Sequence, residues 1–363
     1  MGEEPTFAPQ EFHNEGIAEQ SIEQKVASFE KRNPEQRKEY LTNLLRRSFS
    51  EVSAEVIAIF KKAIGPLIEE QGQMSKDSRW GISTADAERC LFDLVRTKRF
   101  QEALDEVIKE EDVVAEANIS SEETVLEAGA GTGVLALLAA ARGAKKVYAV
   151  EINPQTARVC QKFIKFCGFD DKIEILEGDA TNNNFKLPEN VDVIISENMY
   201  TGLLEEPQMQ IIENLKRFLK EGGRIIPEKF KSYIELATVS GDIGTSKVRR
   251  DVSNVTRIIS GKVQYDEVSF DRKEPLGLDK SVEIEATEDA MVNAVNISSV
   301  IELTKKIRIN SNECDFLGQD EVVALKTPIR VEKGKRYLIH INYKGGDRAR
   351  DVRIEITPVE ESE

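Results

Sequence analysis

Residues 124–151 read TVLEAGAGTGVLALLAAARGAKKVYAVE, and the fold follows from this stretch. Apolar residues at 124–127 predict a short strand, and those at 146–150 predict a second strand that ends on Glu151. Between the two strands lie a glycine-rich turn and a predicted helix over 134–142. Together these parts form one βαβ unit of the kind that holds a nucleoside, because a terminal carboxylate can accept both ribose hydroxyls.

The spacing of the glycines decides between ligands. Gly129, Gly131 and Gly133 follow a G-x-G-x-G pattern, and each lets the backbone approach a ligand that a Cβ would push away. A dinucleotide fingerprint needs a third glycine at position 134, where this chain has Val134. The turn, preceded by Glu127, resembles the first motif of class I S-adenosylmethionine-dependent methyltransferases. The resemblance implies that Glu127 and the three glycines bind the cofactor.

Composition narrows the class of protein. A length of 363 residues predicts two or three domains, and 32% charged with 40% hydrophobic residues is an ordinary soluble balance. The net charge of −15 disfavours nucleic acid as a partner, because phosphates are repelled. No apolar run is long enough to cross a bilayer, so no membrane partner is expected. The four cysteines have no CxxC or zinc-like spacing, which predicts reduced thiols, no metal and a cytoplasmic protein.

The N-terminal part reads as a helical module over residues 1–74. Residues 1–15 are expected to be disordered, and apolar stripes then predict three helices, the second of which begins at Pro34. Pro66 is expected to kink the third helix and Gly72 to end it. The module carries no chemistry, so packing or partner contact is its expected role, with a homo-oligomer through these helices as one form.

The middle part, 75–235, continues the alternation of helix and strand after Glu151. A helix is predicted over 153–167 and strands over 172–176 and 191–196. Ligands sit at the carboxyl ends of the strands in such a sheet. The side chains and turns expected at these ends are Gly129–Gly133, Glu151, Gly178, Asp179, Ala180 and Glu197.

Two further features complete the chain. A long helix is predicted after Pro207, ended by Gly222-Gly223, with a strand starting at Arg224. Beyond residue 235 the pattern alternates apolar and polar residues between turns, which predicts an antiparallel β-barrel or sandwich over 236–363. The predicted fold is therefore α/β: a Rossmann-like methyltransferase sheet with an N-terminal helical module and a C-terminal barrel.

Residues 80–358 resemble the protein arginine methyltransferase family, whose members join a Rossmann-type domain to a β-barrel. The shared motifs are Trp80-Gly81-Ile82, Asp93-x-x-Arg96, the glycine turn, Glu151, Ser196-Glu197-x-Met199, Glu206 nine residues after Glu197, and Val331-Glu332-Lys333-Gly334. The resemblance implies that Arg96 holds the methionine carboxylate and Glu151 the ribose. It also implies that Glu197 and Glu206 hold the guanidinium of the methyl acceptor.

Ordinary structural roles compete with these assignments. Asp93 and Arg96 stand three positions apart on a predicted helix, where they can form a simple surface ion pair. Glu205-Glu206-Pro207 is also a normal helix start, where acids suit the positive end of the helix dipole. Asp179, in contrast, has an expected binding role: it follows a strand, where its carboxylate can accept a hydrogen bond from the exocyclic amine of adenine.

The chain departs from the family in the acceptor half. Asn198 stands where the family has tryptophan, and no tyrosine occurs between Tyr40 and Tyr148, where the family places tyrosines ahead of the cofactor helix. Residues 312–319, the counterpart of a Thr-His-Trp loop, contain no histidine. The dimerisation arm of the family is shortened to 240–262.

The sequence therefore predicts a methyltransferase that uses S-adenosyl-L-methionine and releases S-adenosyl-L-homocysteine. The acceptor is a nitrogen group, with protein arginine as one candidate and another protein or small-molecule acceptor as the alternative. A scaffold that keeps the cofactor fold without catalysis is a further alternative, and a dehydrogenase is disfavoured by Val134.

Overall fold

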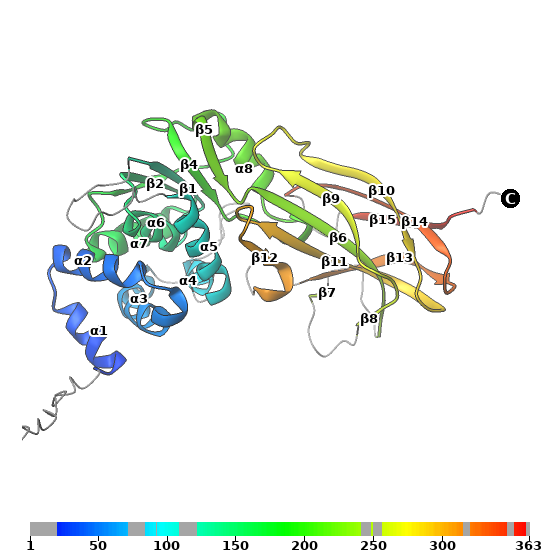
Figure 1. Cartoon of the computed structure of the whole chain (residues 1–363), viewed down its shortest axis with the longest axis horizontal. Coiled ribbons are helices and arrows are strands. Elements are labelled where there is room, and N and C mark those ends of the chain that lie inside the picture. The colour runs from blue at the N-terminus through cyan, green and yellow to red at the C-terminus, as the bar shows by residue number, and fades with distance from the viewer. Residues whose placement is uncertain are drawn as a thin grey trace, which may run out of the picture.

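A parallel sheet flanked by helices and two antiparallel sheets lie end to end along the molecule (Figure 1). The computed structural model describes residues 20–71, 84–91, 93–108, 122–240, 248–249, 256–314, 320–346 and 352–360. The disorder predicted for residues 1–15 and the motif Trp80-Gly81-Ile82 lie outside these ranges, as does Gly72.

The parallel sheet has the strand order β3-β2-β1-β4-β5. Its strands are β1 (Thr124–Ala128), β2 (Lys146–Glu151), β3 (Ile173–Glu177), β4 (Val191–Ser196) and β5 (Leu219–Ile226). Every residue of β1 is buried, which explains its apolar sequence. Because β1 pairs with β2 on one side and β4 on the other, the winding of the chain reverses at β1. The carboxyl ends of β1 and β4 therefore form the crevice where such sheets bind ligands.

Helices cover this sheet and set the loops at its carboxyl edge. The helices that follow the strands are α6 (Val134–Ala141), α7 (Pro154–Cys167) and α8 (Gln208–Leu215). All residues of α6 are buried, so this helix has no polar face. Asn153 caps α7 by accepting from the backbone N–H of Gln155 and Thr156.

The N-terminal helices pack around α6 and α7. They are α1 (Ile22–Glu30), α2 (Pro34–Leu45), α3 (Phe49–Gln71), α4 (Thr84–Leu91) and α5 (Leu94–Val107). Phe60 of α3 meets Phe163 of α7 edge to face, with ring centroids 5.0 Å apart. Arg37 donates to the carbonyl of Phe166 at 3.1 Å. In Figure 1, α1 extends away from the sheet at the end of the molecule opposite the antiparallel strands.

The helix predicted to run to Gly222-Gly223 is shorter than expected. α8 ends at Leu215, a short 3₁₀ turn η2 (Lys216–Phe218) follows, and β5 begins at Leu219. The two glycines lie inside β5, where Gly222 has φ +74°. The pairing of β4 with β5 shifts register between Val191 and Val193, which is the signature of a β-bulge. The prediction was wrong because glycine serves a bulge here and not a helix end.

The C-terminal half consists of antiparallel strands. They are β6 (Lys229–Val239), β7 (Val248–Arg249), β8 (Thr256–Ile258), β9 (Val263–Ser269), β10 (Gly277–Glu285), β11 (Ala290–Glu302), β12 (Arg308–Asn310), β13 (Glu321–Val331), β14 (Arg336–Lys344) and β15 (Arg353–Pro358). One sheet has the order β7-β13-β11-β6-β8, with β9 on β6, and the other β10-β14-β15.

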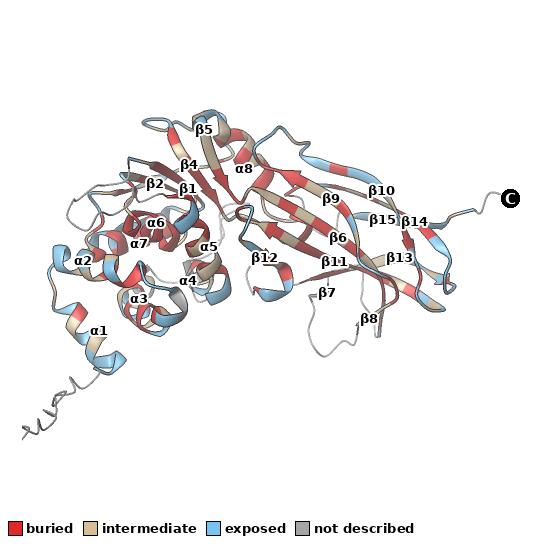
Figure 2. Ribbon diagram, viewed as in Figure 1, coloured by how far each residue is buried: buried red, intermediate tan, exposed pale blue. Residues whose placement is uncertain are grey.

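The two antiparallel sheets enclose a second core, separate from that of the parallel sheet. Ile234, Ile297, Ile339 and Ile341 are fully buried in it. Figure 2 shows buried residues alternating with exposed ones along these strands, as expected where only one face is covered. The predicted α/β sheet with an added antiparallel β domain is confirmed. The chain changes sheet between β5 and β6, and the domain limits at 74 and 235 stay predictions.

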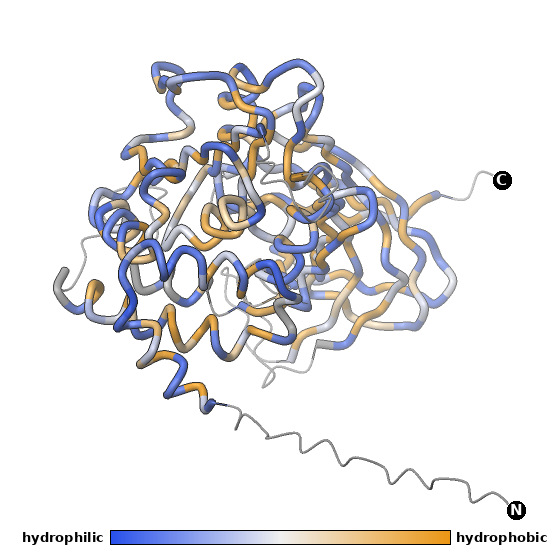
Figure 3. Tube along the Cα trace, turned by 60° about the vertical axis from the view of Figure 1, so that its left-hand side comes forward, coloured by the Kyte–Doolittle hydropathy of each residue, from blue (hydrophilic) through white to orange (hydrophobic). Residues whose placement is uncertain are grey.

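Polar contacts connect the two halves through the segment that follows β4. The N–H of Gly202 donates to Ser299 Oγ at 2.9 Å, and Tyr343 OH donates to the Gly202 carbonyl at 2.6 Å. Tyr200 OH donates to Glu321. Figure 3 shows hydrophobic segments gathered inside both halves and hydrophilic ones along the outer surface. Within the ranges that the structure describes, no helix has the length and apolarity that crossing a bilayer requires.

Candidate active site

The glycine turn follows β1 and is hydrogen-bonded to the end of the neighbouring strand β2. The N–H groups of Gly129 and Ala130 both donate to the Val150 carbonyl at 2.9 Å. Gly129 has φ +77°, and a Cβ there would lie 2.4 Å from the side-chain oxygen of Asn198. Gly131 has φ +54°, so side chains are disfavoured there as well. The turn thus requires glycine for its backbone conformation and for its close packing.

Glu151 ends β2 at the position that the sequence predicted. Its side chain is buried, and its Oε2 accepts from the Gly131 N–H at 2.9 Å while Oε1 accepts from the Asn153 N–H at 2.8 Å. Burial raises the pKa of Glu151 above its usual value. The Ile152 N–H also bonds this carboxylate, which offers about four acceptor positions in all, so an acceptor stays available to a ribose hydroxyl.

The turn after β3 lies beside Glu151. The Gly178 N–H donates to the Glu151 carbonyl at 2.9 Å. Asp179 Oδ1 accepts from the backbone N–H and the hydroxyl of Thr181, at 2.8 and 2.6 Å, which fixes the carboxylate within the turn. The Ala180 carbonyl accepts from Asn214 on α8 at 2.7 Å. The structure therefore brings the predicted ribose and adenine residues to the same edge of the sheet.

Glu127 is a buried acid in the middle of the sheet. Its side chain is 2% exposed, and its Oε2 has no hydrogen-bond partner. Burial raises the pKa of Glu127 to about 8, although the nearby charge of Arg96 opposes the shift. An unpartnered buried carboxyl oxygen is unusual in a folded protein and suits a ligand that donates to it.

Arg96 lies in the first turn of α5 and points into the same site. Asp93 caps this helix by accepting from the Arg96 backbone N–H at 3.0 Å. The Arg96 guanidinium donates through Nη2 to Glu197 Oε2 and through Nη1 to the Cys90 carbonyl at 3.3 Å. Both Asp93 and Arg96 are buried, so the interpretation of the two residues as a surface ion pair is wrong.

Glu197 and Glu206 come together at the end of β4. Burial raises the pKa of Glu197, and the positive charge of Arg96 limits that rise. The pKa of Glu206 is raised well above its usual value, first by burial and then by the negative charge of Glu197. α8 begins only at Gln208, and no side-chain capping bond is made at Pro207. Glu206 therefore precedes the helix and lies within the electric field of Glu197.

Sequence reasoning missed Gln208. This side chain is fully buried; its Oε1 accepts from the Asn198 N–H at 3.1 Å and its Nε2 donates to the Ser196 carbonyl at 3.0 Å. Gln208 thus bonds the backbone on both sides of Glu197. Asn198 in turn donates to the Ala128 carbonyl at 2.7 Å, which ties β4 to the glycine turn. A glutamine at a helix start is unremarkable in sequence, and only its place on a buried helix face gives a signal.

The loop expected to replace a Thr-His-Trp motif is described only in part. Cys314, just after the 3₁₀ turn η3 (Ser311–Glu313), is buried, and burial raises the pKa of its thiol. The nearby negative charge of Asp93 raises this pKa further, and the charge of Arg96 opposes the rise. Residues 315–319 lie outside the described ranges.

Comparisons with known proteins show what the chain is similar to. A family described as methyltransferase domain matches residues 125–223. An uncharacterized protein of Methanocaldococcus jannaschii is 31% identical over 73% of this chain and 94% of its own length. A probable protein arginine N-methyltransferase of Arabidopsis thaliana is 36% identical over 40% of this chain, and protein arginine N-methyltransferase 6 of Danio rerio 42% identical over 31%. The matched regions are 37% and 32% of the lengths of these two enzymes.

A solved structure shares the fold. A chain of the Trypanosoma brucei PRMT1 enzyme–prozyme heterotetrameric complex with AdoHcy aligns with a TM-score of 0.62, at 19% identity over 77% of this chain and 94% of that one. The fold and the site thus define a class I S-adenosylmethionine-dependent methyltransferase. The chain belongs to the same family as the Methanocaldococcus jannaschii protein, within the methyltransferases that resemble protein arginine methyltransferases.

The cofactor of this enzyme is S-adenosyl-L-methionine, and the residues present fit it. A Cβ at Gly131 would already contact Ala87 at 3.4 Å, and Gly131 has φ +54°, so the turn keeps its backbone bare at the carboxyl end of β1. Glu127 Oε2 and Arg96 Nε are buried polar atoms without hydrogen-bond partners. An acceptor and a donor in this state match the amino and carboxylate groups of a bound amino acid. The assignment of individual residues to parts of the cofactor stays a prediction.

Proposed function

We propose that this methyltransferase transfers a methyl group to a guanidinium nitrogen of arginine in a protein substrate. The observation that carries the proposal is that Glu197, buried at the end of β4, already binds a guanidinium, that of Arg96. Glu206 lies close enough for the two acids to influence each other. Two carboxylates suit a planar cation with several donors, because charge-assisted bonds orient it and localise its charge.

The remaining residues serve the donor. Glu151 would accept from the ribose hydroxyls, Asp179 from the adenine amine, and Arg96 would bind the methionine carboxylate. When bound, S-adenosylmethionine supplies an electrophilic methyl group. The chain's own residues hold the acceptor nitrogen in line with it, and positioning of this kind contributes much of the rate.

A proton must also leave the acceptor, because the methylated nitrogen exchanges an N–H bond for an N–C bond. Glu206 suits this task, since its raised pKa makes it a stronger base than an ordinary carboxylate. Glu197, which is paired with a guanidinium, suits the task of holding charge. Glu206 therefore acts as the base, and Glu197 as the residue that holds the guanidinium.

The test compares Glu197→Gln, Glu206→Gln and the double variant, using labelled donor and an arginine-containing peptide. Each single change should lower turnover by roughly 10²-fold and leave donor affinity within a few fold, as loss of a transition-state contact does. If the acids form one clamp, the double variant is no slower than either single one. Glu205→Gln, one residue away, is the control and should keep its activity. Full activity in Glu197→Gln would contradict the guanidinium proposal.

A second acceptor class is favoured by one observation. Burial and the charge of Glu197 both raise the pKa of Glu206, so the site disfavours two negative charges side by side, which suits a neutral nitrogen or oxygen acceptor better than a cation. A methyl-transfer screen over proteins, peptides and metabolites separates the two classes. Activity on neutral metabolites alone would favour the second one.

We also propose that copies of the chain associate through the N-terminal helices. Ile22 of α1 is 39% exposed, and α1 projects from the body of the protein (Figure 1). Ile22→Glu should lower the molar mass measured by light scattering if copies of the chain associate through α1. An unchanged mass above that of the single chain would place the interface elsewhere.

A further inference from the structure

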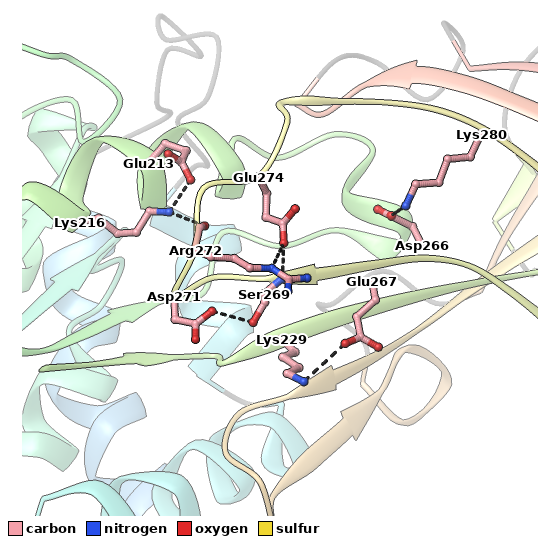
Figure 4. A network of polar contacts seen from close by, with 10 residues as sticks. All are labelled: Glu213, Lys216, Lys229, Asp266, Glu267, Ser269, Asp271, Arg272, Glu274 and Lys280. Atoms are coloured by element: carbon pink, nitrogen blue, oxygen red, sulfur yellow. Dashed lines mark hydrogen bonds and ion pairs between the residues drawn. The ribbon is translucent and has the colours of Figure 1, made fainter. Parts of the chain in front are cut away.

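Carboxylates in the network around the connection between β9 and β10 lie against cations and hydrogen-bond donors (Figure 4). Asp266 pairs with Lys280, and Glu274 accepts from the Arg272 guanidinium at 2.7 Å and from the Ser269 N–H at 3.2 Å. Burial alone would raise the pKa of Glu274, but the bonds from Arg272 and Ser269 outweigh it, and the pKa is lowered. An acid held in this way is ionised at neutral pH.

Glu127 on β1 is held differently. Its side chain is 2% exposed, and its Oε2 has no hydrogen-bond partner among the residues that the structure describes. The backbone N–H of Ala136, in the first turn of α6, donates to the carboxyl. The nearby cation, Arg96, is already paired with Glu197. A buried carboxyl without an ion-pair partner of its own favours the neutral, protonated form.

Titratable groups from several elements influence this carboxyl. Burial is the largest influence and raises the pKa of Glu127 to about 8; Arg96 on α5 opposes the rise, and Glu151 on β2 and Glu197 after β4 add to it. Cys160 on α7 also interacts with Glu127, and burial raises the pKa of this thiol well above its usual value, so the thiol stays neutral. At neutral pH, Glu127 therefore holds its proton.

We propose that Glu127 releases its proton to solvent when the methyl donor binds. The unpartnered Oε2 suits the ammonium group on the amino-acid part of S-adenosylmethionine. As the two groups meet, the O–H bond of the carboxyl breaks, the proton passes to solvent, and the resulting carboxylate accepts from the ammonium N–H. An opposite charge within about 4–6 Å lowers the pKa of a carboxyl by about 1–3, which is enough to ionise Glu127 at neutral pH.

The carboxylate of the donor does not cancel this effect. Its predicted partner, Arg96, is already paired with the carboxylate of Glu197. Exchange of one carboxylate for another around Arg96 leaves the influence of the guanidinium on Glu127 nearly unchanged. The ammonium group is therefore the new charge that Glu127 meets. Because the proton must leave for the ion pair to form, donor affinity should rise with pH up to about 8.

The experiment is isothermal titration calorimetry of the full chain with S-adenosylhomocysteine at pH 7, in two buffers that differ in ionisation enthalpy. The difference in measured binding enthalpy gives the number of protons released. This ligand has the amino-acid part of the donor but no sulfonium charge, so a proton that Glu206 loses in response to that charge is not counted. The wild type should release about 0.4–0.9 proton per ligand, and affinity should rise about two- to eightfold from pH 6 to pH 7.

Two variants and a second ligand serve as controls. Glu127→Gln keeps an acceptor oxygen but has no proton to lose, so its proton release should fall to about zero. Glu274→Gln, which removes an acid that Arg272 already holds, should release as many protons as the wild type. Adenosine lacks the ammonium group and should release no proton from the wild type. The comparison of the two ligands needs no variant, so it tests the proposal even if Glu127→Gln fails to fold.

Three outcomes would overturn the proposal. Absence of proton release from the wild type would show that Glu127 keeps the same charge before and after binding. Equal release from wild type and Glu127→Gln would assign the proton to another acid. Equal release with adenosine would assign it to the ribose side of the site, where burial also raises the pKa of Glu151. The measurement concerns the donor alone, so its result does not depend on the identity of the methyl acceptor.

Discussion

Arg96 and Glu197 form a buried ion pair that joins the first turn of α5 to the end of β4, 101 positions apart in sequence. Their side chains are 7% and 9% exposed, so both charges are removed from water. Burial alone would lower the pKa of Arg96, but the charge of Glu197 raises it, and the guanidinium stays protonated. The same guanidinium is the predicted ligand of the methionine carboxylate, and the same carboxylate is the predicted ligand of the acceptor. Donor binding should therefore loosen this pair and free Glu197 for the acceptor.

Arg96→Lys should weaken binding of S-adenosylhomocysteine about tenfold, because the ammonium group of lysine cannot make the two parallel hydrogen bonds that a guanidinium makes to a carboxylate. Adenosine lacks the carboxylate and should bind both proteins equally. Isothermal titration calorimetry measures both affinities.

The matched control is Arg99→Lys on the same helix, where Arg99 pairs with Glu102 near the surface. This change should affect neither ligand. If Arg96→Lys weakens both ligands to the same degree, Arg96 supports the fold through Glu197 and does not contact the donor.

The parallel sheet could be predicted, because each of its elements is indicated by residues that lie close together in the sequence. The strand 124–127, the glycine turn and Glu151 each follow from apolar runs and residue types close together in sequence. The Arg96–Glu197 pair and the bonds of Gln208 depend on how separate segments pack, and no local pattern carries that information. Gly222 shows the same limit, since a helix end and a β-bulge both use glycine with positive φ.

Glu151→Ala should lower donor affinity by one to two decades. The change removes the predicted acceptors of the ribose hydroxyls, worth on the order of 2–3 kcal/mol, and also releases the Gly131 N–H that Glu151 holds. Calorimetry with S-adenosylmethionine measures the loss. Glu177→Ala is the control, because Glu177 pairs with Glu151 in register at the end of β3 but is exposed. Equal affinities in wild type and Glu151→Ala would refute the ribose assignment.

Glu127→Gln should change how stability depends on pH. Folding raises the pKa of Glu127 to about 8, from about 4.3 in the unfolded chain. Between these values the folded state binds one more proton, so stability is fully present below about pH 4 and falls by about 1.4 kcal/mol per pH unit up to pH 8. The glutamine variant has no such proton, and its melting temperature should fall less from pH 5 to pH 8. Thermal unfolding without donor, with Glu355→Gln as an exposed control, tests this. Parallel curves for wild type and Glu127→Gln would show that Glu127 is ionised throughout.

Gln208→Met should separate positioning from donor binding. Methionine fills a similar volume but leaves the Ser196 carbonyl and the Asn198 N–H without the bonds that Gln208 makes. Unsatisfied buried groups cost about 1–3 kcal/mol each, so stability to denaturant should fall. Turnover should fall about tenfold because the backbone around Glu197 is less fixed, while donor affinity should stay within about threefold. Gln210→Met, which removes a bond from the same helix to Gly345, should lower stability alone.

A purely structural role for Gln208 is distinguished by a second variant, Gln208→Glu. This side chain can still accept from Asn198 and Ser196 but places a negative charge beside Glu197. Like charges raise each other's pKa, so the pH at which turnover rises should move upward in Gln208→Glu and stay in place in Gln208→Met. The pH profile of turnover, measured with saturating donor, shows which occurs. If both variants lose activity in proportion to stability with unshifted profiles, Gln208 only packs α8 onto the sheet and does not position Glu197.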